Sequence, residues 1–269
     1  NLLVRLKEEG IEYDTLLRSH SFAQLTEKVL YCDFIVHLAG VNRSENEAEL
    51  NEGNTELTQS IINVLVDEGL QTPIIYSSSI QAERDNAYGI SKKLAEEALS
   101  SYATVTGSAV FNYRLPNVFG KWCKPNYNSA VATFCYNTIN DLPIQINDPS
   151  AVINLVYIDD VVNEFISLLK AYAAGKSISN TVSVEPVYNI TVGDLAQQLK
   201  AFKQSKESGI IERVGTSLTR ALYSTYISYF RPEQFNYSLV KHEDPRGVFV
   251  EMLKTKDSGQ FSFFSAHPG

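Results

Sequence analysis

The sequence predicts an α/β protein whose parallel sheet is doubly wound, with helices on both faces. Segments typical of strands and of helices alternate along most of the 269 residues. Two of the strand-like runs, 32–40 and 72–79, are mostly apolar, as expected for strands that helices cover on both faces. Alternation of this kind is typical of a parallel sheet built from strand–helix–strand units.

The expected helices combine apolar residues at helical spacing with signals for a helix start or end. Ser21 is a good N-cap, and Asp159 and Asp160 suit a first helical turn. The expected helices cover 1–9, 21–30, 55–68, 88–103 and 159–172. The expected strands cover 13–17, 32–40, 72–79, 109–120 and the residues from 154 up to that last helix.

The pattern changes near Arg213, after which short aromatic and β-branched runs are separated by turn signals. The runs 235–239, 247–255 and 259–266 predict β-hairpins and therefore a second, all-β module. Residues 203–209 are the expected linker. We therefore divide the chain into 1–205 and 206–269, the second range containing the linker and the β-rich part.

Composition excludes several classes of protein. The net charge is −8 without a long basic run, which argues against nucleic-acid binding. Cys32, Cys123 and Cys135 show no metal-site spacing, so a reducing, cytoplasmic location fits best and no metal is expected. No apolar run reaches the ~18 residues of a membrane span, and no signal peptide is recognisable.

Ser77–Ser79, Tyr88 and Lys92 form the candidate proton-transfer site. The three serines end an expected strand, and Tyr88 and Lys92 lie four residues apart at the start of an expected helix, hence on one face. A nearby ammonium favours the phenolate and lowers the pKa of a tyrosine towards the working range. A serine at the strand end can donate to the same substrate oxygen.

Tyr-x-x-x-Lys alone is a weak pattern, because Tyr172/Lys176 and Tyr237/Lys241 also match it. Only Tyr88 follows a buried strand ending in serines and begins a helix. Ligands of open parallel sheets bind beyond the carboxyl ends of the strands, where these serines are expected.

Five motifs resemble those of extended short-chain dehydrogenases/reductases that act on nucleotide sugars: HLAG (37–40), SSSIQ (77–81), YGISK (88–92), RLPNVFG (114–120) and NLVYIDDVV (154–162). Longer strings at 116–136, 222–229 and 244–251 resemble CapF-type bifunctional capsular polysaccharide enzymes, across essentially the whole chain. That family joins a Rossmann-like reductase domain to a C-terminal cupin domain. The resemblance implies truncation at both ends, with the first strand missing and only the start of the cupin present.

The resemblance also assigns roles by position. Tyr88 is the expected acid/base, Lys92 tunes it and holds the nicotinamide ribose, and Ser79 is the expected catalytic serine, with Ser78 as its rival. Further residues are expected to contact NADPH: Arg18, Leu38, Ala39, Gly40, Ser77 and Leu115. Others are expected to contact the UDP-sugar substrate: Ser79, Asn117, Arg43, Lys121, Asn126 and, more weakly supported, Lys124. The last four of these can equally be solvated surface groups. The alternative for Arg18 is a solvated loop arginine, and the alternative for Asn117 is an asparagine that satisfies loop backbone. His37 is expected to be packed at a strand end.

Two family features are absent from this sequence. The Gly-rich phosphate loop would precede Asn1, and the cupin histidines that hold zinc would follow Gly269; His242 and His267 do not replace them. The chain can therefore hold the proton-transfer residues yet bind cofactor poorly, and no cupin epimerase activity is expected.

The resemblance implies NADPH-dependent reduction of the 4-keto group of a UDP-2-acetamido-2,6-dideoxy-hexos-4-ulose in capsular polysaccharide biosynthesis, by a homodimer when the protein is full length. The alternatives are a nucleotide-sugar epimerase and a non-catalytic dinucleotide-binding protein. A 4,6-dehydratase is disfavoured, because no acidic residue stands in the SSSIQ segment.

Overall fold

The computed structural model describes residues 1–44 and 46–267. They form two compact units, each continuous in space but not in sequence. The first consists of Asn1–Pro116 and Asp159–Val187, and the second of Asn117–Ile158 and Tyr188–Gly269.

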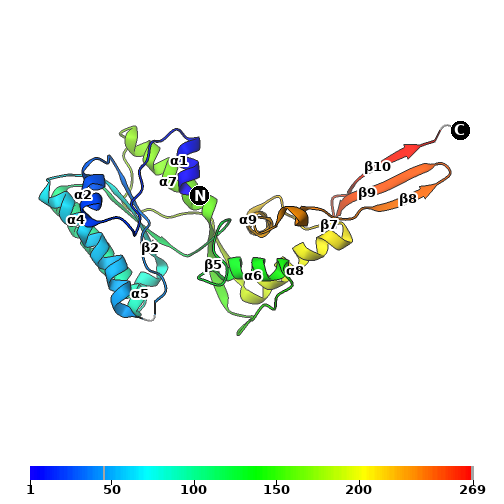
Figure 1. The fold of residues 1–269 in the computed structure, drawn as a ribbon, viewed down its shortest axis with the longest axis horizontal. Coiled ribbons are helices and arrows are strands. Elements are labelled where there is room, and N and C mark those ends of the chain that lie inside the picture. The colour runs from blue at the N-terminus through cyan, green and yellow to red at the C-terminus, as the bar shows by residue number, and fades with distance from the viewer. Residues whose placement is uncertain (45, 268–269) are drawn as a thin grey trace. The chain divides into compact units, whose positions relative to one another are not determined.

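The first unit is built on a three-stranded parallel sheet (Figure 1). β1 (Ile35–His37) pairs with β2 (Ile74–Ser79), and β2 pairs with β3 (Val110–Leu115). On one face, α2 (Phe22–Leu30), α4 (Leu57–Asp67) and α5 (Ala87–Thr106) enclose a core with β2.

α7 (Ile158–Ala173) covers the opposite face of this sheet. Its Phe165 ring lies 4.9 Å from the ring of Tyr113 on β3, and Tyr172 packs edge-on against Phe34 and Phe111. Parallel strands with helices on both faces confirm the predicted fold class.

Local signals explain the helix ends. Ser21 caps α2 through a reciprocal capping box with Gln24. The Asn86 side chain accepts from the Gly89 amide and starts α5, which ends at Gly107 with φ 75°. The remaining short elements are α1 (Leu2–Glu8), α3 (Glu47–Leu50), a π-helical segment (Asn51–Glu56) and a 3₁₀ turn (Ile80–Glu83).

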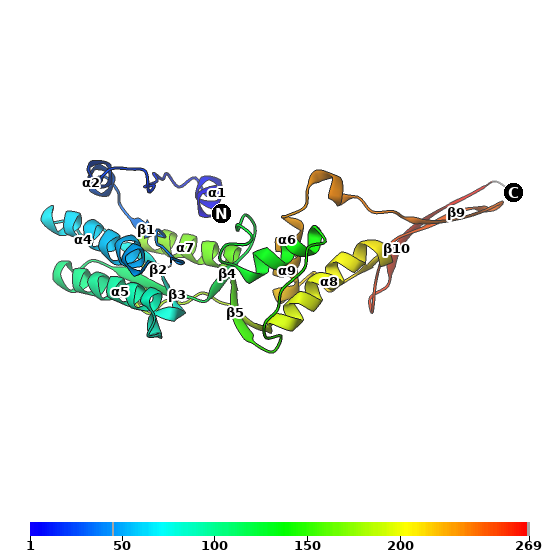
Figure 2. The same cartoon turned by 60° about the horizontal axis from the view of Figure 1, so that its bottom comes forward.

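The second unit contains a sheet in the order β4-β5-β6 and three helices packed on one core (Figure 2). Large buried side chains from all three helices form that core, among them Phe134, Phe202 and Tyr226. The strands are β4 (Asn117–Phe119), β5 (Val152–Tyr157) and β6 (Val187–Thr191), and the helices are α6 (Ala130–Ile139), α8 (Val192–Ser208) and α9 (Ser217–Ile227).

The same unit ends in a four-stranded sheet. β9 (Gly247–Thr255) pairs antiparallel with β8 (Val240–Asp244) and β10 (Gln260–Ala266), and parallel with β7 (Ile210–Ile211). A 3₁₀ turn at Pro232–Phe235 precedes β8. The antiparallel pairs confirm the expected hairpins on both sides of β9.

The expected strand at 13–17 is wrong: the structure has no strand there. A strand needs a neighbour for its backbone groups, and within the described residues β1 pairs only with β2. The expected strand at 109–120 forms two strands in different sheets, because Pro116, which lacks a backbone N–H, separates β3 from β4.

Two expectations for the C-terminal part are also wrong. The expected linker belongs to α8, and residues 217–227, placed in an all-β module, form α9. The apolar positions 218, 221, 222 and 226 have helical spacing, which the neighbouring β-type runs obscured.

The first hairpin strand is 240–244 rather than 235–239. The two-residue turn at Pro245–Arg246 pairs Asp244 with Gly247, so the residues just before the turn form the strand.

Candidate active site

The three consecutive serines at the carboxyl end of β2 have three different hydrogen-bond partners. The Ser77 hydroxyl donates to the His37 carbonyl at 3.2 Å. The Ser78 hydroxyl is buried and donates to Glu96 on α5. The Ser79 hydroxyl accepts from the Gln81 amide at 3.1 Å and caps the following 3₁₀ turn. The alternation of side chains along a strand explains why Ser78 faces α5.

Tyr88 lies in the first turn of α5 and is half-buried. Burial raises the pKa of its phenol, and a hydrogen bond with the Ser79 side chain works in the opposite direction. The pKa lowering expected from Lys92 is therefore not observed, because burial outweighs the stabilisation of the phenolate. Tyr88 is protonated at neutral pH, which suits a proton donor.

Lys92 is one turn further along α5, and only 4% of its surface is exposed. Its Nζ donates to the Ser77 carbonyl at 3.0 Å and lies 4.8 Å from the centroid of the Tyr76 ring. Burial lowers the pKa of this ammonium to about 8, while the charge of Glu96 raises it.

Glu96 lies a further turn along, so Tyr88, Lys92 and Glu96 form one ridge of the helix. Both Glu96 oxygens accept from Arg114 on β3, with Nε at 3.0 and 3.2 Å and Nη2 at 2.6 Å. Arg114 also pairs with Glu83 at 3.0 Å. The sequence analysis missed Glu96, although its spacing of four residues from Lys92 would have found it.

The loop after β1 is exposed at Leu38, Ala39 and Gly40, which were expected to line the cofactor. A Cβ on Gly40 would lie 2.5 Å from Asn54 Oδ1 and 3.2 Å from Lys92 Nζ. Asn54 is fully buried and bonds to both backbone groups of Val41, which fixes the loop beside α5. The exposed loop after β1 therefore lies beside the Lys92 ammonium.

The other candidates on the first unit have different environments. Arg18 and Arg43 are exposed, and Leu115 is buried at the end of β3. His37 is buried against Thr58, with Nε2 and Oγ1 2.9 Å apart, and burial lowers the pKa of its ring to about 3. His37 is thus neutral and packed, as its strand-end position suggested.

The remaining substrate candidates lie on the second unit. Asn117 is exposed and donates to the Asn154 carbonyl at 3.1 Å. Asn126 is exposed, with a left-handed backbone at φ 55°. Lys121 lies 5.7 Å from the Trp122 ring, and Lys124 lies 5.8 Å from the Tyr127 ring.

The two other Tyr-x-x-x-Lys matches do not form a helical pair. Tyr172 is in α7, which ends at Ala173 before Lys176. Tyr237 donates to the Met252 carbonyl at 3.2 Å from a segment without helix, and Lys241 is in β8.

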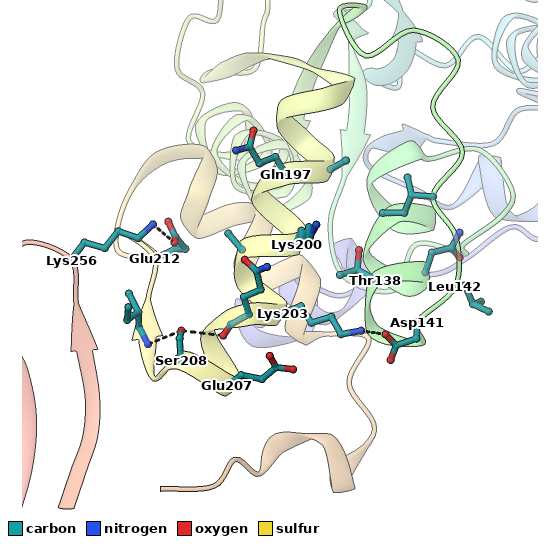
Figure 3. A pocket seen from close by; sticks show the side chains of 16 residues that line it. Thr138, Asp141, Leu142, Gln197, Lys200, Lys203, Glu207, Ser208, Glu212 and Lys256 are labelled. Carbon is teal, nitrogen blue, oxygen red and sulfur yellow. Dashed lines mark hydrogen bonds and ion pairs between the residues drawn. The ribbon is translucent and has the colours of Figure 1, made fainter. Parts of the chain in front are cut away.

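A groove of about 1330 Å³ lies on the second unit, between the end of α6, α8 and β7 (Figure 3). Its charged side chains include the ion pairs Lys203–Asp141 and Lys256–Glu212. None of Ser79, Tyr88 and Lys92 lines it. Across residues 1–44 and 46–267, no cluster of His, Cys, Asp and Glu could hold a metal ion, and no helix could cross a membrane.

Gly89, beside Tyr88, allows α5 to start close to the 3₁₀ turn. A Cβ there would lie 2.2 Å from the Gln81 carbonyl oxygen and 2.6 Å from that of Arg84. Since backbone must move to relieve this overlap, we expect Gly89→Ala to lower the free energy of unfolding by about 2–3 kcal/mol in urea titrations.

Gly107→Ala at the other end of α5 is the matched control for that substitution. Gly107 has φ 75° and open space around a new Cβ, so only backbone strain of about 1 kcal/mol is expected. An equal loss for both variants would contradict the packing argument.

A parallel sheet covered on both faces, with a Ser–Tyr–Lys group at the carboxyl end of its central strand, defines a dinucleotide-dependent enzyme class. The model of the NAD dependent epimerase/dehydratase family matches residues 4–190, and the chain belongs to that family. Membership implies a nicotinamide dinucleotide cofactor.

Within this family, the chain is similar to characterised proteins over its whole length. It is 54% identical over 272 residues to a UDP-2-acetamido-2,6-beta-L-arabino-hexul-4-ose reductase of Pseudomonas aeruginosa, covering 100% of the chain and 72% of that protein. Its structure is similar to the crystal structure of capsular polysaccharide assembling protein CapF from Staphylococcus aureus, with TM-score 0.87. The two sequences are 39% identical, and the match covers 100% of this chain and 72% of that one. The similarity predicted from the motifs is confirmed.

A more distant structure shares the fold alone. The UDP-N-acetylglucosamine 4-epimerase from Bacillus cereus is 20% identical, with TM-score 0.63, over 74% of this chain and 76% of that one.

Proposed function

We propose that this chain is the reductase part of an enzyme that reduces the 4-keto group of a UDP-2-acetamido-2,6-dideoxy-hexos-4-ulose with NADPH, in capsular polysaccharide biosynthesis. The observation that carries the proposal is the group Ser79, Tyr88 and Lys92 at the end of β2 and the start of α5. The reductase from Pseudomonas aeruginosa, 54% identical, supports the substrate class.

The residues of this chain supply the proton and the charge stabilisation. The bound cofactor supplies the hydride to the carbonyl carbon. Tyr88, protonated at neutral pH, donates its proton to the carbonyl oxygen as negative charge develops there. The Ser79 hydroxyl donates a hydrogen bond to the same oxygen.

Lys92 has two functions in this proposal. Its ammonium stabilises the phenolate that Tyr88 becomes after the transfer. Only its bond to the Ser77 carbonyl is made to protein oxygen in the described contacts, so other N–H groups can hold the nicotinamide ribose. In the same proposal, Gly40 lets the ribose approach, and the exposed Arg18 binds the 2′-phosphate of NADPH, as the family resemblance implies.

Ser79 rather than Ser78 is the proposed catalytic serine. The Ser78 hydroxyl donates to the buried Glu96 carboxylate, whereas Ser79 interacts with Tyr88. Substrate contacts by Asn117, Arg43, Lys121 and Asn126, and a homodimer in the full-length protein, belong to the same proposal.

A single-turnover assay of the full-length protein tests this function. With the UDP-4-keto sugar in place, we expect NADPH to be oxidised in equal amount to sugar reduced, and NADH to be used less well. Isomerised sugar with NADPH unoxidised would instead indicate an epimerase. Cofactor binding without any change in the sugar would indicate a non-catalytic protein.

A further inference from the structure

The end of β2 is attached to α5 at two consecutive residues. The Ser77 carbonyl accepts from Lys92 at 3.0 Å, and the Ser78 hydroxyl donates to Glu96. The next residue is Ser79, the proposed catalytic serine. Lys92 and Glu96 therefore both hold the end of β2 against α5 at the residues just before Ser79.

We propose that Glu96 is a positioning residue of the reductase: it keeps Lys92 positively charged and holds the end of β2 against α5, so that Ser79 and Tyr88 face one substrate oxygen. This inference rests on the proposed function and adds a residue to its site. Glu96 does not itself contact the reacting atoms, since its oxygens are occupied by Ser78 and Arg114.

Among the groups around Lys92, Glu96 is the acidic group that stabilises the charged form of its ammonium. Tyr88 on the same helix and Tyr76 on β2 both have their pKa raised by burial and are neutral at physiological pH. His37 on β1 is neutral as well, and Arg114 on β3 is a second cation. In the part of the chain that the structure describes, Glu96 is the anion acting on the Lys92 ammonium.

The burial of Glu96 strengthens the effect of its charge on Lys92. Its side chain is 8% exposed, so water screens it far less than a surface carboxylate. Arg114, which bonds to both Glu96 oxygens, offsets part of that charge.

The pH profile of kcat in Glu96→Gln tests the proposal in the full-length protein. Glutamine keeps the shape and an acceptor for Ser78 but removes the charge. Lys92 should then lose its proton at lower pH, so the alkaline limb should move down by about 0.5–1 pH unit. Glu97→Gln is the matched control, because Glu97 is the exposed neighbour on the same helix and should leave the profile unchanged.

Arg114→Gln is a second variant, chosen in case Glu96→Gln does not fold. It should shift the alkaline limb of the kcat profile in the opposite direction. The Arg114 side chain is 43% exposed. Removing it takes a cation away and leaves the charge of Glu96 unshared, so the alkaline limb should move to higher pH. Glu83→Gln is its control, since Glu83 is 71% exposed and pairs with Arg114 alone in the described contacts.

An NMR titration separates this inference from the proposed function. With carbon-labelled lysine, and Lys92→Met for assignment, the Lys92 signal should titrate at lower pH in Glu96→Gln than in the wild type, whether or not the sugar turns over. Reduced kcat with an unmoved pH profile and an unmoved Lys92 titration would overturn the proposal and leave Glu96 as a structural residue only.

Discussion

Tyr88→Phe lowers turnover of the 4-keto sugar by at least about a hundredfold and leaves NADPH binding intact, as expected if Tyr88 is the proton donor. Phenylalanine keeps the half-buried ring and removes only the hydroxyl that interacts with Ser79. Turnover should be measured as NADPH oxidation under saturating substrate, and binding by quenching of intrinsic fluorescence.

Tyr172→Phe is the matched control for this prediction. Tyr172 also stands four residues before a lysine but packs against Phe34, away from the serines of β2. Its replacement should leave turnover within about twofold of wild type. If Tyr88→Phe behaved like Tyr172→Phe, the acid assigned here would be wrong.

Lys92→Met abolishes turnover and at the same time stabilises the protein, which is the second large effect we expect. Activity falls because the phenolate loses its neighbouring cation. Stability rises because burial moves the pKa of the ammonium from 10.5 to about 8, even with the opposing charge of Glu96 included, a cost of about 3 kcal/mol. Methionine fits the same volume and can pack on the Tyr76 ring.

The stability difference between Lys92→Met and the wild type should depend on pH. Below pH 8, Lys92 is protonated in both folded and unfolded states, so the full burial cost applies. Between about pH 8 and 10.5, only the unfolded state stays protonated, so the wild type gains stability relative to Lys92→Met. The stability advantage of the variant, from urea unfolding, should therefore be about 1–3 kcal/mol at pH 7 and shrink towards pH 10.

A difference between the two proteins that stays constant from pH 7 to 10 would contradict the burial argument. The comparison must be between these two proteins, because tyrosines whose pKa is raised by burial in the folded state begin to ionise near pH 10 in the unfolded state, which affects both proteins equally. Lys93→Met, at an exposed position of α5, should change neither activity nor the pH dependence of stability.

The sequence predicts that Ser77–Ser79, Tyr88 and Lys92 lie near one another, because the signals for this grouping are local. Serines at the end of an apolar run and a four-residue spacing each depend on neighbours in the chain. The family resemblance then distinguishes Tyr88 from the two chance matches.

The missed features depend on residues far apart in sequence. Glu96 matters through Arg114 and Ser78, each eighteen residues away along the chain. The segment 13–17 has strand-like composition but no strand to pair with in the described residues. The pKa of Tyr88 depends on how deeply the phenol is buried, which the spacing of Tyr88 and Lys92 does not determine.

The ridge formed by residues 88, 92 and 96 limits how this gene can change in length. Each residue of an α-helix turns by about 100°, so one inserted or deleted codon between Tyr88 and Glu96 would rotate the later groups away from β2. Point changes at exposed positions such as Lys93 and Glu97 leave that geometry intact. Substitutions on the exposed face of this helix are therefore tolerated, whereas insertions and deletions between Tyr88 and Glu96 are not.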